Sequence, residues 1–154
     1  MPNAFIQQSI EMAVENVHRG GGPFAALVVK DGIVIATGCN QVTRTNDPTA
    51  HAELVAIREA CRVLGDFQLK GCDLYCSCEP CPMCLGAIFW ARPERVFFAA
   101  TRADAGAAGF EDTLIYEQIA VPHSERSIPM IHVVDPQSGR PFGEWVSQPH
   151  KAEY

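Results

Sequence analysis

"CDLYCSCEPCPMCLGAIFWARPERVFFAAT", residues 72–101, is the stretch that decides the fold. Its first seven residues, "CDLYCSC", predict a β-strand, and "PCPMCLGAIFWAR", residues 80–92, predicts a helix. "RVFFAAT", residues 95–101, then predicts a second strand. A strand, a helix and a strand in succession indicate two parallel strands joined by a crossover helix. The sequence therefore predicts an α/β fold.

The residues nearer the N-terminus predict a helix and a hairpin. Residues 4–19 have the spacing of an amphipathic helix that ends at "GGGP". Its expected core side consists of Phe5, Ile10, Ala13 and Val17. "FAALVVK", residues 24–30, and "IVIATGCN", residues 33–40, flank an Asp-Gly pair, which is a strong hairpin signal.

A further helix is expected over residues 48–64. Asp47 can cap its start, and Pro48 would lie in the first turn, where proline is tolerated. Helical spacing predicts a buried stripe formed by Ala50, Leu54, Ile57, Cys61 and Leu64.

The pattern weakens after residue 103. "LIYEQIA", residues 114–120, predicts a short helix, and "MIHVV", residues 130–134, predicts a short strand. The tail, residues 135–154, contains three prolines and gives no clear element. A chain of 154 residues is long enough for one domain with a full core, so we expect a single domain over residues 1–154.

Composition restricts the class of protein. The N-terminus lacks a basic region followed by a long apolar run, and no stretch approaches the ~20 apolar residues of a membrane span. We therefore expect a cytoplasmic protein without a membrane partner, in which cysteines bind metal or take part in catalysis. The net charge of −6 does not favour a nucleic-acid partner.

His51 and Glu53 are two residues apart near the start of the helix expected over residues 48–64. Side chains at this spacing point in different directions around a helix, so they can converge only on a group beyond its N-terminus. That end favours an anionic group because its N–H groups are free. The alternative is a buried histidine beside a surface glutamate, and the pair alone leaves it open.

"CEPCPMC", residues 78–84, supplies the other half of a metal site. Cys81 and Cys84 lie on one side of a helix start, where the N-terminus lowers the pKa of a thiol. With His51 they form a zinc ligand set that leaves one coordination position open, as in catalytic sites, so we expect one zinc per chain. A thioredoxin-like redox pair is the alternative, but it predicts neither His51 nor Glu53. The other cysteines are expected to act as small buried apolar residues: Cys39, Cys61, Cys72, Cys76 and Cys78.

The sequence also resembles a known family. "HAE", residues 51–53, with "PCPMC", residues 80–84, matches the signature of zinc-dependent nucleoside and nucleobase deaminases. "GGPFAALVVKDG", "SCEPCPMCLGAIFWAR", "AGFEDTLIY" and the terminal "KAEY" resemble the bacterial guanine deaminase branch. The resemblance implies a three-layer α/β/α cytidine deaminase-like fold with a five-stranded mixed sheet.

The same resemblance implies hydrolysis of guanine to xanthine and ammonia. Glu53 would then be the catalytic acid–base and not a ligand. The expected purine contacts are Phe24, Asn40, Ala52, Asp112 and Tyr154. Phe24 can alternatively be a core residue, Asn40 can be a turn cap, and Glu111 can take the role of Asp112.

The tail is expected to close the pocket. Tyr154 would help to exclude water and grip the purine edge. The deaminases that the chain resembles are commonly homodimers, so the tail of one subunit can instead serve the neighbouring one. A disordered end is the alternative.

Other functions remain open at the level of sequence. Guanosine, cytosine or an aminotriazine are alternative substrates, because one small group changes binding by only a few kcal/mol. A tRNA adenosine deaminase would share "HAE" and "PCxMC" but needs basic residues, and this chain has 12 Lys and Arg against 18 Asp and Glu. A non-enzymatic zinc protein normally needs a fourth protein ligand, and the sequence offers no evident one.

Overall fold

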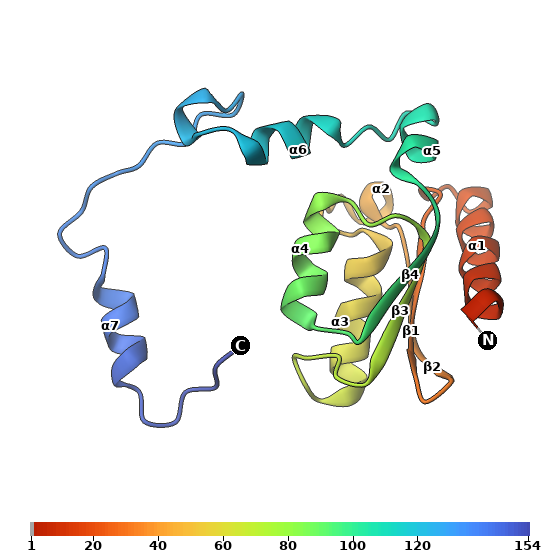
Figure 1. The fold of residues 1–154 in the computed structure, drawn as a ribbon, viewed down its shortest axis with the longest axis horizontal. Helices are drawn as coiled ribbons and strands as arrows, with labels where there is room; N and C mark the ends of the chain where they lie inside the picture. Colours follow the sequence, from red (N-terminus) through yellow and green to blue (C-terminus); the bar gives the residue numbers. More distant parts are fainter. Residues whose placement is uncertain (1) are drawn as a thin grey trace. The chain divides into compact units, whose positions relative to one another are not determined.

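A computed structural model describes residues 2–154, in which a β-sheet lies between helices on both faces (Figure 1). The elements are, in chain order, α1 Pro2–His18, β1 Ala25–Lys30, β2 Ile33–Cys39, α2 Val42–Thr45, α3 Ala52–Leu64, β3 Cys72–Cys78, α4 Pro82–Ala91, β4 Arg95–Ala100, α5 Arg102–Ala107, α6 Thr113–Ala120, the 3₁₀ turn His123–Glu125 and α7 Arg140–Ser147. The chain divides into a first compact unit that ends at Asp112 and a second unit, Thr113–Tyr154.

The sheet confirms the α/β fold and corrects the number of strands. Its order is β2-β1-β3-β4, with β1 antiparallel to both neighbours and β3 parallel to β4. The strand, helix and strand expected within residues 72–101 are therefore present. Within residues 2–154 the sheet has four strands, so the expectation of five is wrong.

The expected strand at residues 130–134 is absent from the described part of the chain. This segment has no regular structure, and Ile131 and Val134 are more than four-fifths exposed. Its apolar residues have the composition of a strand, but a strand forms only where another strand edge accepts its backbone hydrogen bonds. Local sequence cannot supply that edge.

The hairpin is formed as the Asp-Gly pair predicts. Asp31 and Gly32 have φ values of 50° and 75°, which are the left-handed conformations that a tight two-residue turn requires. Lys30 pairs with Ile33 across this turn, the register shifts at an irregularity between Val28 and Val29, and the pairing then extends to Ala25 opposite Cys39. The hairpin thus determines where β2 ends, and with it the position of Asn40, the residue that follows the strand.

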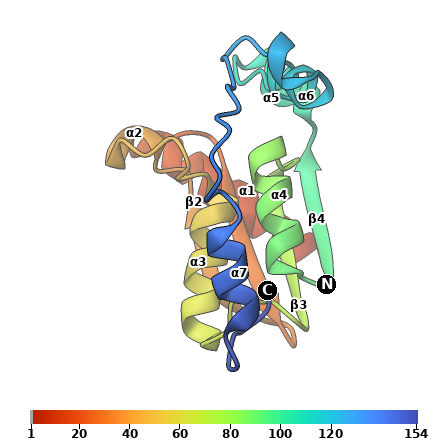
Figure 2. The same cartoon turned by 90° about the vertical axis from the view of Figure 1, so that its left-hand side faces the viewer.

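Alternating side chains of the strands build two separate cores. Ala26, Val28 and Leu74 face α3 and α4, where Ala56 and Ile88 are buried against them. Figure 2 shows α3 and α4 side by side on this face of the sheet. The opposite face of the sheet packs under α1. Its buried residues are Leu27, Val29 and Tyr75, and the partly buried side chains packed against them are Phe5, Ile6, Met12, Val34 and Phe97.

The face that α1 buries differs from the expected one. Ile10 and Val17 are 41% and 47% exposed, whereas Ser9 and Asn16 are almost fully buried. Both buried polar side chains donate to backbone carbonyls, Ser9 within its own helix and Asn16 to distant loops. Hydrogen bonds offset the cost of burying them, which the apolar pattern alone does not predict.

Helix α3 begins at Ala52 and not at residue 48. Asp47 does not cap it, because its carboxylate accepts from the backbone N–H and the hydroxyl of Thr49 at 2.8 and 2.7 Å. This local turn competes with helix formation, and His51 becomes the N-cap residue. The buried face is accordingly shifted from the expected stripe, and it consists of Ala52, Glu53, Ala56, Ile57 and Ala60.

The second unit contains the helix expected over residues 114–120, which is α6. It also contains α7, which the sequence did not predict because Pro141 and Gly143 disfavour helices. Pro141 lies in the first turn, where its missing N–H costs no helical bond. None of the helices in residues 2–154 has the length and apolar character that crossing a membrane demands.

Candidate metal centre

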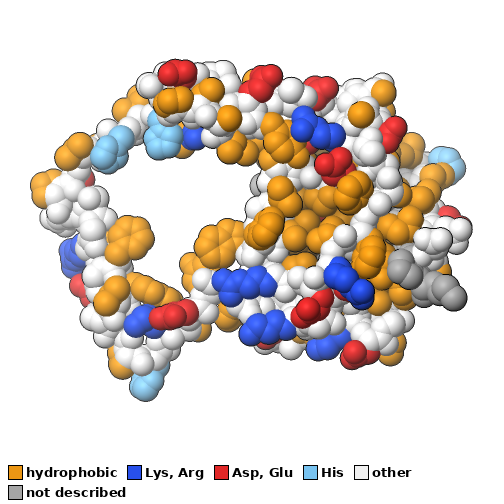
Figure 3. All heavy atoms as spheres, viewed as in Figure 1, with side chains coloured by type: hydrophobic (Ala, Val, Ile, Leu, Met, Phe, Trp, Pro, Cys, Tyr) orange, Lys and Arg blue, Asp and Glu red, His pale blue; other side chains and the backbone are white. Residues whose placement is uncertain are grey.

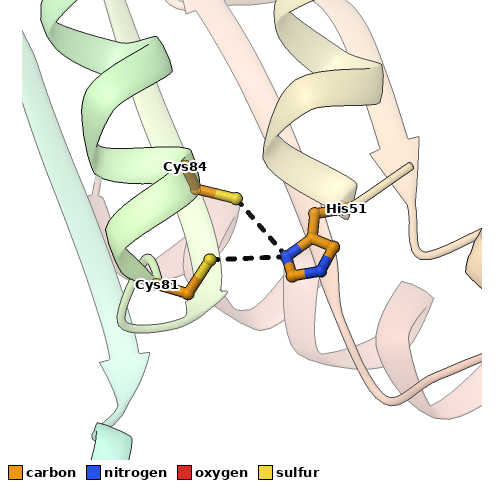
Figure 4. A group of neighbouring side chains, drawn as sticks. All are labelled: His51, Cys81 and Cys84. Carbon is orange, nitrogen blue, oxygen red and sulfur yellow. Dashed lines mark hydrogen bonds between the residues drawn. The ribbon is translucent and has the colours of Figure 1, made fainter. Parts of the chain in front are cut away.

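Two helix N-termini bring the three expected ligands together (Figure 4). His51 is the N-cap residue of α3, and Cys81 is the N-cap residue of α4. Both residues have extended backbones, which turn their side chains beyond the helix ends. Cys84 lies in the first turn of α4 and is fully buried.

The distances among the donor atoms fit zinc. His51 Nδ1 lies 3.5 Å from Cys81 Sγ and 3.5 Å from Cys84 Sγ, and all three donor atoms lie within 4.8 Å of one another. Tetrahedral zinc, with bonds of ~2.1 Å to nitrogen and ~2.3 Å to sulfur, holds such atoms about 3.6 Å apart. The side chains therefore match the expected ligand set without rearrangement.

The two cysteines differ in their electrostatics, because the hydrogen bond to Cys81 and burial raise the pKa of the Cys84 thiol while that of Cys81 is lowered. A hydrogen bond from Cys84, aided by His51, lowers the pKa of the Cys81 thiol to about 4. The same thiolate character of Cys81 raises the pKa of His51 above its usual value. A thiolate is the form of cysteine that binds zinc. Burial also raises the pKa values of the Cys76 and Cys78 thiols, which lie outside the ligand group.

Glu53 is the one carboxylic acid buried beside these ligands among the residues described. It is 7% exposed, and burial raises the pKa of its carboxyl above the usual range. It lies at the second position of α3, near Cys84, but it is not part of the ligand group. A carboxyl in this position can exchange protons with a molecule that approaches the metal.

The approach of α3 to the sheet depends on Gly38. A Cβ at Gly38 would lie 2.2 Å from the carbonyl oxygen of Ala52 and 2.5 Å from the backbone nitrogen of Ala56. Ala52 itself is fully buried. Glycine on β2 therefore allows the first turn of α3, which carries His51 and Glu53, to lie directly on the strand.

Phe24 and Asn40 lie next to each other at the end of the hairpin. The backbone N–H of Asn40 donates to the carbonyl of Phe24 at 3.0 Å. Phe24 is half-buried, touches the core and packs edge-on against Phe110, with ring centroids 5.0 Å apart. Asn40 is 7% exposed, and its side-chain oxygen accepts from the backbone of Val42 at 3.3 Å. Asn40 therefore makes the turn cap that was its alternative role, and its backbone is hydrogen-bonded to that of Phe24.

Asp112 is held near the start of α5. The Nε of Arg102 lies 3.6 Å from Asp112 Oδ1, and Asp112 is 17% exposed, whereas Glu111 is exposed. The backbone N–H of Arg102 in turn donates to Glu79, three residues before Pro82 of α4, at 2.9 Å.

Tyr154 lies in the second unit, where its ring meets that of Trp145 edge-on.

Sequence reasoning missed several residues around this site. No role was expected for Asn16, Gly38 or Phe110, whose contacts join separate segments of the chain. The local sequence around these residues contains no signal from which these contacts could be predicted.

Comparisons with known proteins agree with this arrangement. The family model described as the cytidine and deoxycytidylate deaminase zinc-binding region matches residues 2–100. Guanine deaminase of Bacillus subtilis (strain 168) is 54% identical over 151 residues, which are 97% of each chain. The X-ray structure of guanine deaminase from Bacillus subtilis covers 99% of this chain and 98% of its own, with a TM-score of 0.97. The tRNA-specific adenosine deaminase of Aquifex aeolicus is 43% identical over 96 residues, 62% of this chain and 64% of its own.

Proposed function

Since the chain belongs to the zinc-binding cytidine and deoxycytidylate deaminase family, we propose that it hydrolyses guanine to xanthine and ammonia. One observation carries the choice of substrate. The likeness to a guanine deaminase spans 97% of both chains, whereas the likeness to a tRNA-specific adenosine deaminase spans 62% of this one. The longer match includes Asp112, which is the residue expected to recognise the purine.

His51, Cys81 and Cys84 would hold the zinc. Zinc in such a site lowers the pKa of water to about 7 and so supplies a nucleophile at neutral pH. Helices α3 and α4 both begin at these ligands. The free N–H groups at the two helix N-termini therefore favour the negative charge that develops during attack on the purine ring.

Glu53 moves the protons. Its carboxylate accepts a proton from the attacking water while a C–O bond forms at C2 of guanine and the C2=N3 double bond opens, and the carboxyl passes this proton to N3. It then takes the proton of the new C2 hydroxyl and delivers it to the exocyclic amine, so that a C=O bond forms, the C–N bond breaks and ammonia leaves. Burial of Glu53 raises its pKa, which makes the carboxyl a better base and lets it hold the proton between the two steps.

Three side chains would bind the purine. Phe24 offers an aromatic face, and Asn40 offers a buried amide. The carboxylate of Asp112 accepts from ring N–H groups, which guanine has at N1 and neutral adenine lacks. The ion pair with Arg102 orients this carboxylate.

An assay of amine release tests the function directly. The zinc-loaded protein is incubated with guanine, guanosine, adenine, cytosine and an aminotriazine, and ammonia is measured together with the ring product. We expect guanine to have the highest kcat/KM and to yield equal amounts of xanthine and ammonia. A preference for adenosine in tRNA, or no ammonia from any base, would overturn the proposal.

Replacing Asp112 by Asn should weaken the use of guanine. An amide can present its NH₂ toward the ring N–H groups, and it also loses the charge that pairs with Arg102. We expect kcat/KM for guanine to fall roughly 10- to 100-fold, as for the loss of a charged hydrogen bond. Glu111→Gln is the matched control, and wild-type kinetics in Asp112→Asn with a defect in Glu111→Gln would reverse the assignment.

The second unit supports the proposal of a homodimer. Within residues 113–154 many large apolar side chains are exposed, and Figure 3 shows hydrophobic side chains along its surface. They include Leu114, Ile119, Ile131, Val134, Phe142 and Val146. Exposed apolar surface of this extent marks an interface, and an exchanged terminal segment is a low-cost route to a dimer.

We place the enzyme in the cytoplasm because all seven cysteines are free and two serve as ligands.

Deleting residues 150–154 should reduce activity toward guanine. We propose that Tyr154 helps to close the pocket, so its loss admits water and weakens the grip on the purine. The expected result is a severalfold lower kcat/KM with an unchanged zinc content, because the ligands lie in the first unit. An unchanged kcat/KM would show that the tail is not a lid.

Mixing two impaired variants tests whether the tail serves the neighbouring subunit. The tail-deleted protein is combined with Glu53→Gln, and heterodimers are verified by differential tagging. If the tail crosses, one active site of the heterodimer combines an intact Glu53 with an intact tail, and activity rises. If verified heterodimers gain no activity, each tail closes its own pocket.

A further inference from the structure

Asn16 is a buried polar residue on α1 that no deaminase motif contains. It is 4% exposed and projects from the face of α1 that covers the sheet. Its Nδ2 donates to the carbonyl of Gly22 at 2.7 Å and to the carbonyl of Asn40 at 3.0 Å. One amide group therefore bridges the loop after α1 and the end of β2.

These two acceptors belong to the segments that carry the expected purine contacts. The carbonyl of Gly22 also accepts from the backbone N–H of Phe24 at 2.9 Å, so Asn16 holds the turn that leads into Phe24. On the other side it holds the backbone of Asn40 itself. Asn16 thus fixes the positions of Phe24 and Asn40, the aromatic and the amide expected to contact the purine, relative to each other.

The surrounding glycines show how closely this region is packed. A Cβ at Gly22 would lie 2.9 Å from both Cγ and Oδ1 of Asn40, and a Cβ at Gly21 would lie 2.4 Å from Nδ2 of Asn16. No larger residue fits at either position without moving an amide. The loop therefore lies directly against both asparagines, and small shifts of Asn16 would be passed on to Asn40.

Arg44 of α2 sets the orientation of the Asn16 amide. Its guanidinium donates to Asn16 Oδ1 at 2.8 Å, which assigns that atom as oxygen and leaves both N–H bonds of Nδ2 for the two carbonyls. Arg44 is exposed, so it acts on the amide from the solvent side. Every donor and acceptor of the Asn16 side chain is thereby used in one arrangement.

We propose that Asn16 is a positioning residue that sets the spacing between Phe24 and Asn40 and thereby the affinity of the site for a flat purine. It touches neither the metal ligands nor Glu53, so its effect falls on substrate binding and not on the proton transfers. The proposal rests on the proposed guanine deaminase activity, because that activity gives Phe24 and Asn40 their roles.

The decisive variant is Asn16→Asp in the zinc-loaded protein. The two side chains have the same shape, but aspartate loses both donors and keeps the acceptor toward Arg44. We expect KM for guanine to rise at least about tenfold, the size of one lost hydrogen bond, with kcat changed less than about threefold and full zinc content. Ser9→Ala is the matched control, because Ser9 is equally buried on α1 but bonds only to Ile6 of the same helix.

A second variant covers the case in which Asn16→Asp folds poorly. Arg44→Met removes the contact that orients the amide, and its exposed position spares the core. We expect a smaller rise in KM, of about threefold, without loss of thermal stability. An unchanged KM in a well-folded Asn16→Asp protein, or in Arg44→Met when Asn16→Asp is unfolded, overturns the proposal.

A double-mutant cycle with Asn40→Ala separates positioning from general stability. If Asn16 acts through Asn40, then Asn16→Asp raises KM much less in the Asn40→Ala background than in the wild type. Equal effects in both backgrounds overturn the positioning role. If the wild-type protein does not deaminate guanine, the proposed function is overturned. If the wild-type protein deaminates guanine and the variants have an unaltered KM, only the positioning role of Asn16 is overturned.

Discussion

Glu53→Gln should lower kcat for guanine by about 10²–10⁴-fold, while the protein keeps close to one zinc per chain. Glutamine has nearly the same volume as glutamate, so the buried position in the first turn of α3 remains filled. The amide cannot accept a proton from water or return one to the leaving amine. KM should change little, because Glu53 is not among the residues expected to hold the purine.

Glu59→Gln is the control on the same helix. Glu59 is paired with Arg62 on the exposed side of α3 and has no contact with the ligand group. We expect wild-type kinetics from this variant. The assignment of Glu53 would be wrong if Glu53→Gln retained near-normal kcat at full zinc content, measured by metal analysis on the same samples.

Cys84→Ala should abolish both zinc binding and activity. Cys84 is fully buried at the first turn of α4, and its sulfur lies 3.5 Å from Nδ1 of His51. Its removal leaves two protein ligands where catalytic zinc sites use three. We expect a zinc content near zero and a kcat/KM reduced by at least about 10³-fold, because zinc supplies the nucleophile.

Chelation gives the complementary measurement. Wild-type protein treated with a strong chelator should lose activity and regain it when zinc is added back, whereas Cys84→Ala should not recover. Cys61→Ala is the control, because Cys61 is a half-buried cysteine outside the ligand group. Full zinc content in Cys84→Ala, or loss of zinc in Cys61→Ala, would contradict the ligand set.

The parts of the fold that could be predicted are those with local signals. Residues 72–101 change from a strand pattern to a helix pattern and back, and the structure has β3, α4 and β4 there. The turn at Asp31 and Gly32 follows from the conformations that these two residues tolerate. In both cases neighbouring residues contain all the necessary information.

The errors arise where a distant partner or a competing local bond decides. Residues 130–134 have the composition of a strand but find no strand edge within the described chain. Asp47 bonds to Thr49 and so leaves the capping role to His51. Asn16 is buried because Gly22 and Asn40 offer it carbonyls, and no periodic pattern encodes that.

The candidate site divides along the same line. His51, Glu53, Cys81 and Cys84 could be named from spacing, because a metal demands particular donors at the ends of two helices. The purine contacts came from a resemblance and remain predictions. Sequence reasoning could not have found Gly38, because its importance lies in a side chain that is missing.

Gly38 has a consequence for how mutations and homologous sequences are judged. The first turn of α3 occupies the space that any side chain at this position would need. A substitution there would tilt the helix and separate His51 from the two cysteines of α4, which belong to a different segment of the chain. A gene could therefore retain every residue of the deaminase signature and still encode a protein that loads no metal. Screening for inactive homologues should include this position in β2 as well as the ligands.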